Sequence, residues 1–262
     1  MGTINFDHLN FYTMKHEGIE FLKKMFFVFN FTFLLSSVLV AQVFIETYPP
    51  VSNNTDMGVR ISGMQNLSDR LSYEKITGSP FYNDEWQLAS LTGMNEKEKW
   101  LCKVKINLAT GELYYQDKQG HELVADDGLI RKIVLHKNDD TSAVVATFIL
   151  TPEPVKLNQE RRNSYMQVLN GGSYQLLKLN IRNLNSADSL FGTQKRYFFK
   201  DEEVYFIHHN EMLNNLRRLD KDNLLQFLPG SSVYIDWAKQ NKINFRKEED
   251  VIRFMNYYNS KK

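Results

Sequence analysis

The sequence contains a single cysteine, Cys102, and this scarcity excludes two kinds of stabilising site. One cysteine cannot form a disulfide bond within the chain, so a disulfide-stapled scaffold is excluded. A zinc site built on several cysteine ligands is excluded for the same reason. Because Cys102 lies among apolar residues near the start of a predicted strand, we expect a small buried side chain rather than a reactive thiol.

The chain also has almost no excess charge of either sign. Lysine and arginine total 32, aspartate and glutamate total 31, and the formal net charge is +1. A nucleic-acid-binding domain normally has a clustered basic face, so we expect no nucleic-acid partner. Hydrophobic residues make up 42% of the chain and aromatic residues 13%, which is enough for a sizeable core.

Motifs for catalysis and nucleotide binding are missing as well. The sequence has neither of the glycine-rich phosphate loops, GxxxxGK[ST] and GxGxxG, and no GxSxG or HExxH motif. The pairs Asp126-Asp127 and Asp139-Asp140 lie in predicted turns, where aspartate hydrogen-bonds to the nearby backbone. We therefore predict no catalytic, cofactor-binding or metal-binding residue, and no cofactor.

His208, His209 and Glu211 are the best candidates for polar chemistry. A strand over Val204–His209 turns neighbouring side chains to opposite faces, so the two histidines cannot easily bind one metal ion. We expect a structural or surface role for them. An unrecognised hydrolase that uses one of these histidines with a carboxylate is a lesser alternative.

An uncharged apolar run, Met25–Ala41, follows the basic pair Lys23-Lys24. A basic flank, an apolar stretch and a small final residue are typical of a secretory signal peptide, with cleavage near Ala41-Gln42. We therefore expect a periplasmic or secreted protein. The alternative is an uncleaved anchor, which is the one route by which we expect contact with a membrane.

Alternating apolar and polar residues predict an antiparallel β-meander in the middle of the chain. Its predicted strands are Trp100–Leu108, Glu112–Gln116, His121–Val124 and Leu129–His136. The next segment, Ala143–Leu150, is almost continuously apolar, which predicts a central strand that is covered on both faces.

Two further hairpins are predicted after residue 160. The first joins Arg161–Leu169 to Ser173–Leu179 across a turn that contains two glycines. The second joins Arg196–Phe199 to Val204–His209. The polar segment Asn180–Thr193 between these hairpins is expected to be a loop.

The last part of the chain changes to a helical period. Asp220 is placed to cap one short helix, Ser231 or Ser232 a second, and Lys247–Tyr258 has one apolar face. The predicted fold is mainly β (α+β): a curved antiparallel meander or partly open barrel with a C-terminal cluster of short helices. The predicted parts are a signal peptide with its polar lead (1–41), an extended segment (42–72), an antiparallel β domain (73–218) and a helical segment packed on that domain (219–262).

Aromatic residues suggest two possible ligand surfaces. Phe81, Tyr82 and Trp86 form either a plug at one end of the sheet or an aromatic platform. If the curved sheet encloses a cavity, five rings are candidates for its lining. These rings are Phe148, Tyr165, Tyr174, Phe198 and Phe206. The alternative is that they fill the core.

Two regions of the chain resemble a group of uncharacterised secreted proteins of the Bacteroidota. The first is Thr77–Tyr82 followed by the strand-turn-strand segment Lys103–Tyr115. The second is Asn241–Ile243 followed by Glu248–Ile252 and Asn256–Asn259. The resemblance implies an envelope protein and adds no catalytic residue or cofactor.

Taken together, these patterns favour an exported cell-envelope protein that is not an enzyme. We expect it to act by binding an unknown envelope protein or a surface. The alternative is a periplasmic carrier of a hydrophobic, apolar ligand.

Overall fold

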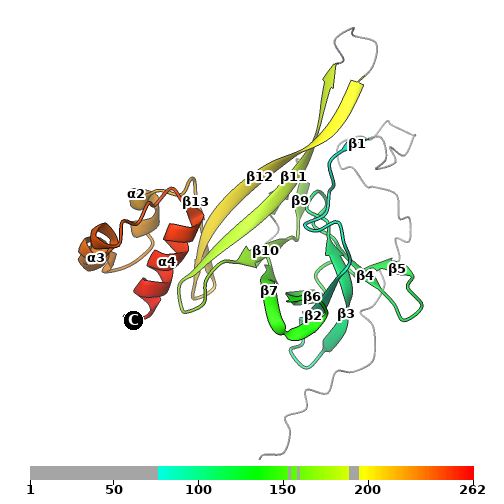
Figure 1. Cartoon of the computed structure of the whole chain (residues 1–262), viewed down its shortest axis with the longest axis horizontal. Helices are drawn as coiled ribbons and strands as arrows, with labels where there is room; N and C mark the ends of the chain where they lie inside the picture. The colour runs from blue at the N-terminus through cyan, green and yellow to red at the C-terminus, as the bar shows by residue number, and fades with distance from the viewer. Residues whose placement is uncertain (1–75, 153–154, 158–159, 189–194) are drawn as a thin grey trace, which may run out of the picture. The chain divides into compact units, whose positions relative to one another are not determined.

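A computed structural model describes residues 76–152, 155–157, 160–188 and 195–262 (Figure 1). The predicted signal peptide with its polar lead (1–41) and the predicted extended segment (42–72) lie outside these described residues. Among the helices that are described, none is long and apolar enough to cross a membrane.

The described residues are mainly β and form one 11-stranded sheet that is not closed into a barrel. Its strand order is β1-β12-β11-β10-β7-β6-β2-β3-β4-β5, and β13 also pairs with β12. The strands are Ile76–Thr77 (β1), Gln87–Gly93 (β2), Lys99–Ile106 (β3), Leu113–Gln116 (β4), Glu122–Val124 (β5), Ile130–Lys137 (β6), Asp140–Leu150 (β7), Tyr165–Val168 (β10), Gln175–Asp188 (β11), Lys195–His209 (β12) and Met212–Leu216 (β13). Val155–Leu157 (β8) and Glu160–Arg162 (β9) form a separate hairpin. The predicted fold class is thus confirmed, with one parallel pair, β1 and β12, in an otherwise antiparallel sheet.

The first core lies inside the curved region from β2 to β7. Trp100, Cys102 and Val104 of β3 are buried, whereas Leu101 and Lys103 between them are exposed. This alternation is the one that predicted the strand. The expectation that Cys102 is a core residue is confirmed, and burial raises the pKa of its thiol to about 12.

The predicted meander is interrupted by a strand that the sequence did not reveal. β2 lies between β3 and β6, so β6 pairs with β2 and not with β5. Its sequence, Gln-Leu-Ala-Ser-Leu-Thr-Gly, contains few of the large apolar residues that mark strands. The long-range pairing of β2 with two strands therefore compensates for a weak local preference.

The prediction that Ala143–Leu150 is covered on both faces is wrong for its first half. β7 is indeed central, between β6 and β10, but Val144 and Val145 are 58% and 51% exposed. The register between β6 and β7 shifts beside His136, so that Val145 lies opposite no residue of β6. Such a β-bulge disrupts the regular alternation of faces.

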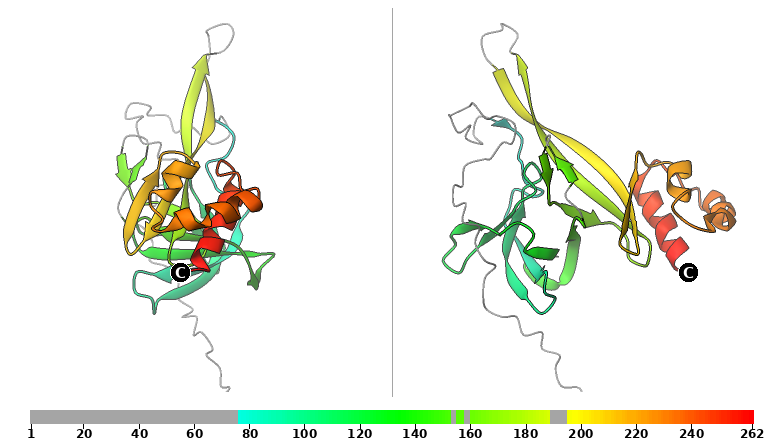
Figure 2. Two further views of the ribbon diagram at one scale, coloured as in Figure 1. Left: turned by 90° about the vertical axis from the view of Figure 1, so that its left-hand side faces the viewer. Right: turned by 180° about the vertical axis from the view of Figure 1, so that it is seen from behind.

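The predicted loop Asn180–Thr193 is wrong for residues 180–188, which belong to β11. The second predicted hairpin is also wrong, because both of its predicted strands belong to one uninterrupted strand, β12. β11 and β12 pair continuously from Gln175↔His208 to Asp188↔Lys195 (Figures 1 and 2). The polar residues that suggested a loop and a turn meet partners across this pair. Asn183 donates to Glu202 over 2.9 Å, and such cross-strand pairs stabilise a sheet.

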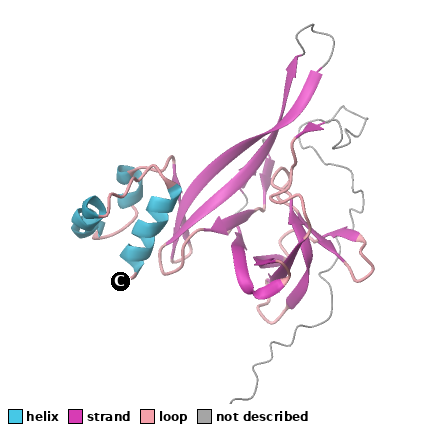
Figure 3. Ribbon diagram, viewed as in Figure 1, coloured by secondary structure: helices cyan, strands magenta, loops and turns pink. Residues whose placement is uncertain are grey.

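The helices follow the last strand and share a second core with the sheet (Figure 3). They are Lys221–Leu225 (α2), the 3₁₀ helix Ser231–Tyr234 (η2), Ile235–Gln240 (α3) and Glu248–Asn259 (α4). Asp220 caps α2 as predicted, because its carboxylate accepts the Asn223 N–H over 2.9 Å. The predicted serine cap is wrong: Gly230 precedes η2 and no side chain caps it.

α4 is attached to the sheet at both of its ends. At its start, Glu248 accepts hydrogen bonds from Lys178 and from the Tyr205 hydroxyl, each over 2.7 Å. At its end, the Asn259 side chain accepts from the Tyr174 N–H over 3.1 Å and donates to the Gly171 carbonyl over 2.9 Å. The helix therefore fastens the turn between β10 and β11.

β11 and β12 expose two different apolar surfaces because successive residues alternate between faces. One face, with Leu176 and Ile207, packs in the core that contains the helices. The opposite face has Leu177, Leu179 and Phe206, in a third cluster with Ile149 and Val168 of β7 and β10 as partners. We call this opposite face the apolar face of the ribbon.

Candidate functional site

A cavity of about 1430 Å³ lies against the apolar face of the ribbon. Leu179 and Ile181 of β11, Val204 and Phe206 of β12 and Ile149 of β7 form its apolar walls. Three of these residues are largely buried, since Leu179, Ile181 and Phe206 are only 2%, 7% and 7% exposed. This large hollow, with an apolar stretch on the ribbon and polar residues around it, is a candidate binding site for a hydrophobic molecule.

The register of the two strands explains how the cavity is built. Leu179 pairs with Val204, Ile181 with Glu202, and Gln175 with His208. At about 3.3 Å per residue, the distance along β12 from Glu202 to His208 is about 20 Å. The apolar rows, Leu179 with Val204 and Leu177 with Phe206, therefore lie between a mixed row, Ile181 with Glu202, and a polar row, Gln175 with His208.

The polar end at β13 contains Gln175, His208 and Glu211. Nδ1 of His208 lies 3.2 Å from Oε1 of Gln175. An amide oxygen is an acceptor only, so Nδ1 bears the proton and Nε2 keeps its lone pair. Burial lowers the pKa of His208 and the neighbouring His209 lowers it further, while Glu211 acts in the opposite direction. The imidazole is therefore neutral at pH 7.

Two further charged residues, Arg131 and Glu202, line the cavity. Arg131 is paired with Glu96, with Nη1 and Oε1 2.5 Å apart. A second hollow of about 540 Å³ adjoins this region, and Arg131, Ile149 and Gln175 line both hollows. Lys132 lines the second hollow but not the first.

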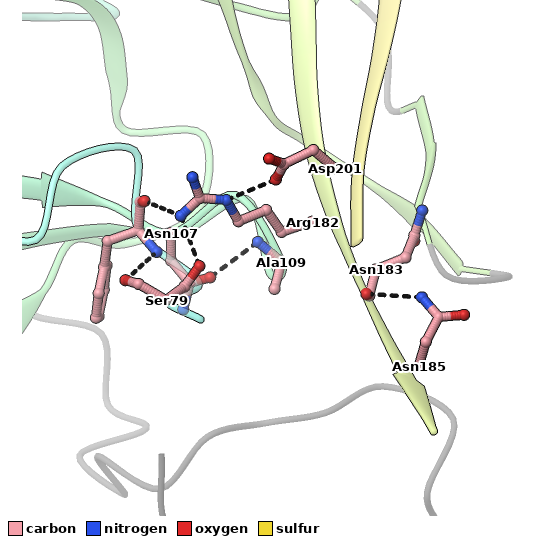
Figure 4. A network of polar contacts seen from close by, with 8 residues as sticks. Ser79, Asn107, Ala109, Arg182, Asn183, Asn185 and Asp201 are labelled. Atoms are coloured by element: carbon pink, nitrogen blue, oxygen red, sulfur yellow. Dashed lines mark hydrogen bonds and ion pairs between the residues drawn. The ribbon is translucent and has the colours of Figure 1, made fainter. Parts of the chain in front are cut away.

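An arginine network holds the ribbon beside the first core (Figure 4). The Arg182 guanidinium donates to the carbonyls of Ser79 and Phe81, and to the Asp201 carboxylate over 2.9 Å. The Arg182 N–H also donates to the Leu108 carbonyl over 3.1 Å. Since Arg182 follows Ile181 directly, these bonds fix one wall of the cavity.

Three of the eight site residues suggested by the sequence meet at this cavity: Phe206, His208 and Glu211. His209 points to the other face, as the alternation predicted. Its ring stacks on Tyr174 with the centroids 3.7 Å apart, and its Nδ1 lies 2.9 Å from the Ser173 carbonyl oxygen. The two histidines consequently have separate environments.

The other four candidate rings lie elsewhere. Phe148 and Tyr165 are buried in the first core, and Phe148 meets Tyr82 edge to face with centroids 5.0 Å apart. Tyr174 belongs to the core that contains the helices. Phe198 lies in β12 where that strand pairs with β1. Of the five rings proposed as a lining, Phe206 alone lines the described cavity.

Sequence reasoning missed most of the apolar wall. Leu179 and Ile181 line the cavity, but Ile181 falls in the segment predicted to be a loop. The signal was present, because Leu177, Leu179 and Ile181 continue one period-2 pattern into the polar stretch. Leu213, on the unpredicted β13, lines the cavity as well.

Ser90 and His136 are a described pair of a nucleophile and a base, with Oγ and Nε2 2.7 Å apart. His136 is 4% exposed, and its Nδ1 has no hydrogen-bond partner in the described part of the chain. A serine–histidine pair normally needs a third group on Nδ1 to orient the base. The pair therefore has the geometry of a structural hydrogen bond.

Among the described residues, no group of three or more His, Cys, Asp or Glu side chains is placed to hold a metal ion.

Comparisons of the chain with protein-family models, with curated proteins and with solved structures find no match. Function therefore has to be inferred from the chemistry of the cavity.

Proposed function

We propose that this protein is an exported, non-enzymatic carrier that binds a hydrophobic ligand in the cavity on the apolar face of the ribbon. The observation that supports this most is the group of apolar lining residues Leu179, Ile181, Val204 and Phe206 on one face of β11 and β12. The proposed location outside the cytoplasm depends on the predicted signal peptide, Met25–Ala41.

The size of the cavity favours a long ligand. Pockets for small molecules usually measure about 300–1,000 Å³, and this cavity measures about 1430 Å³. Burial of a methylene group contributes about 0.8 kcal/mol. A chain of about ten methylenes therefore contributes about 8 kcal/mol, from which the costs of association and of ordering the ligand are subtracted.

The sequence alone favoured contact with a protein or a surface over ligand carriage. The cavity favours ligand carriage, because its apolar residues Leu179, Ile181 and Phe206 lie together on one face of the ribbon, whereas single exposed apolar residues are common on any protein surface. One observation still supports a protein contact as the second candidate: the exposed pair Val144 and Val145 on β7.

The carrier proposal is tested with the neutral fluorescent probe N-phenyl-1-naphthylamine. We expect the wild-type protein to bind the probe, and Val204→Lys to weaken binding at least tenfold because it places a charge in the apolar wall. Val145→Lys is the matched control, since it makes the same change at an exposed strand position outside the cavity lining. Equal probe binding by the two variants, or no binding by wild type, contradicts the proposal.

A further inference from the structure

We infer that the carried molecule is a cationic amphiphile, an apolar chain with an ammonium head group that binds at the Gln175–His208–Glu211 end of the cavity. This inference rests on the proposed function and specifies its ligand class. It depends on three features of the cavity: its formal charges, the hydrogen-bonding capacity of one end, and the separation of that end from the apolar rows.

The charges that line the cavity favour a cation. Glu202 and Glu211 line it, and neither forms an ion pair with a described residue. Among the described lining residues, the one positive charge is that of Arg131, which is paired with Glu96 at 2.5 Å. An anionic head group would therefore be repelled by carboxylates that have no described ion-pair partner, whereas an ammonium group would be attracted to them.

The hydrogen-bonding groups at the β13 end favour the same class. The carboxylate of Glu211 is an acceptor, and the neutral His208 keeps an acceptor lone pair on Nε2 because its Nδ1 donates to Gln175. An ammonium group has three N–H donors and no acceptor. A carboxylate head group would instead bring further acceptors to an end that already has them.

The position of these groups also favours a head group at this end of the cavity with its chain along the ribbon. His208 and Gln175 pair across β12 and β11, and the next rows on the same face are Phe206 with Leu177 and Val204 with Leu179. A head group held beside His208 therefore places its chain along the apolar walls. The other basic residue nearby, Lys132, lines the adjoining hollow rather than this one.

The test compares three amphiphiles with the same chain: dodecylammonium, dodecanoate and the neutral dodecanol. Each is used at pH 7.5 to displace N-phenyl-1-naphthylamine from the full chain, and direct binding is measured by calorimetry. We expect dodecylammonium to bind at least tenfold more tightly than dodecanoate. Glu211→Gln should reduce this ratio at least threefold and leave dodecanol binding unchanged. Glu249→Gln, at an exposed position of α4, is the matched control and should keep the wild-type ratio.

The outcomes separate the two proposals. If the probe and dodecanol bind but dodecanoate binds as tightly as dodecylammonium, or if Glu211→Gln leaves the ratio unchanged, the head-group inference is wrong and the carrier proposal stands. If the probe and all three amphiphiles fail to bind, the carrier proposal is overturned, and the inference about its ligand with it.

Discussion

At the scale of single residues, His136 shows how the fold tolerates a buried polar group. Its Nε2 lies 2.7 Å from the Ser90 hydroxyl, and its Nδ1 has no partner among the described residues. Burial lowers the pKa of His136 below its usual 6.5. The imidazole is therefore held neutral in the folded protein, and protonation has to be accompanied by a loss of stability.

This leads to a prediction for the pH dependence of stability. The unfolded chain takes up a proton at His136 near pH 6.5, whereas the folded protein resists it. The free energy of unfolding is therefore greatest above pH 6.5 and decreases as the pH falls below it. Urea unfolding at pH 7.5, 6 and 5 measures this decrease, which should be smaller in His136→Gln.

His208 also has a lowered pKa, so His136→Gln should keep part of the pH dependence. The aspartates with lowered pKa values, Asp117, Asp140 and Asp220, titrate below 3.8 and so do not affect this window. Identical pH profiles for wild type and His136→Gln would contradict the prediction.

At the scale of elements, the turn between β10 and β11 depends on contact with the end of α4. Gly172 has a φ of 103°, and a Cβ placed there would lie 2.6 Å from Cγ of Asn259. We therefore expect Gly172→Ala to reduce the free energy of unfolding by at least about 1–2 kcal/mol, from left-handed backbone strain alone. Urea unfolding measures the change.

Gly171→Ala provides the matched control one position earlier. A Cβ at Gly171 would meet no atom within 4 Å. We expect a change within about 0.5 kcal/mol, as for most surface substitutions. If the two alanine variants are equally stable, the contact with Asn259 does not constrain this turn.

The elements also show why part of the fold was predictable. Local alternation identified β3, β4 and β6, and the capping residue Asp220 identified α2, because these signals lie within a few neighbouring residues. The charged stretch Lys200–Glu203 looked like a turn, since its partners are on β11 and only the folded ladder brings them together.

The candidate site shows the same difference between residues with a local sequence signal and residues placed by long-range strand pairing. His208 and Phe206 were found because each is an unusual residue on a recognisable strand. Leu213 was missed because its role depends on strand pairing that local patterns do not reveal. Ile181 was missed because its period-2 pattern runs into a polar stretch that is typical of a loop. The cavity itself is a property of the register between β11 and β12, so no single segment predicts it.

At the scale of the whole described structure, β11 and β12 contribute side chains to two of the three hydrophobic clusters. Leu176 and Ile207 pack in the core with the helices, and Leu177 and Phe206 face the other way. Loss of this strand pair would therefore disrupt the cores on both faces. We expect the folded part of the chain to unfold in one cooperative transition.

Two of the three tryptophans can report on this directly. Trp100 lies in the first core and Trp237 packs against the core with the helices. We expect variants that retain only Trp100 or only Trp237 to show a fluorescence midpoint in urea that coincides with the midpoint from far-UV circular dichroism of the same variant. A helical region that unfolds separately would give different midpoints when Trp237 is the probe.

The bonds made by Asn259 join two segments that are 85 residues apart in the chain, because its side chain closes the turn at Tyr174. Closing so long a loop costs conformational entropy. The packing of α4 in the core with the helices has to offset this cost. Contacts between residues so far apart slow folding, so we expect the joining of α4 to this turn to be a late step.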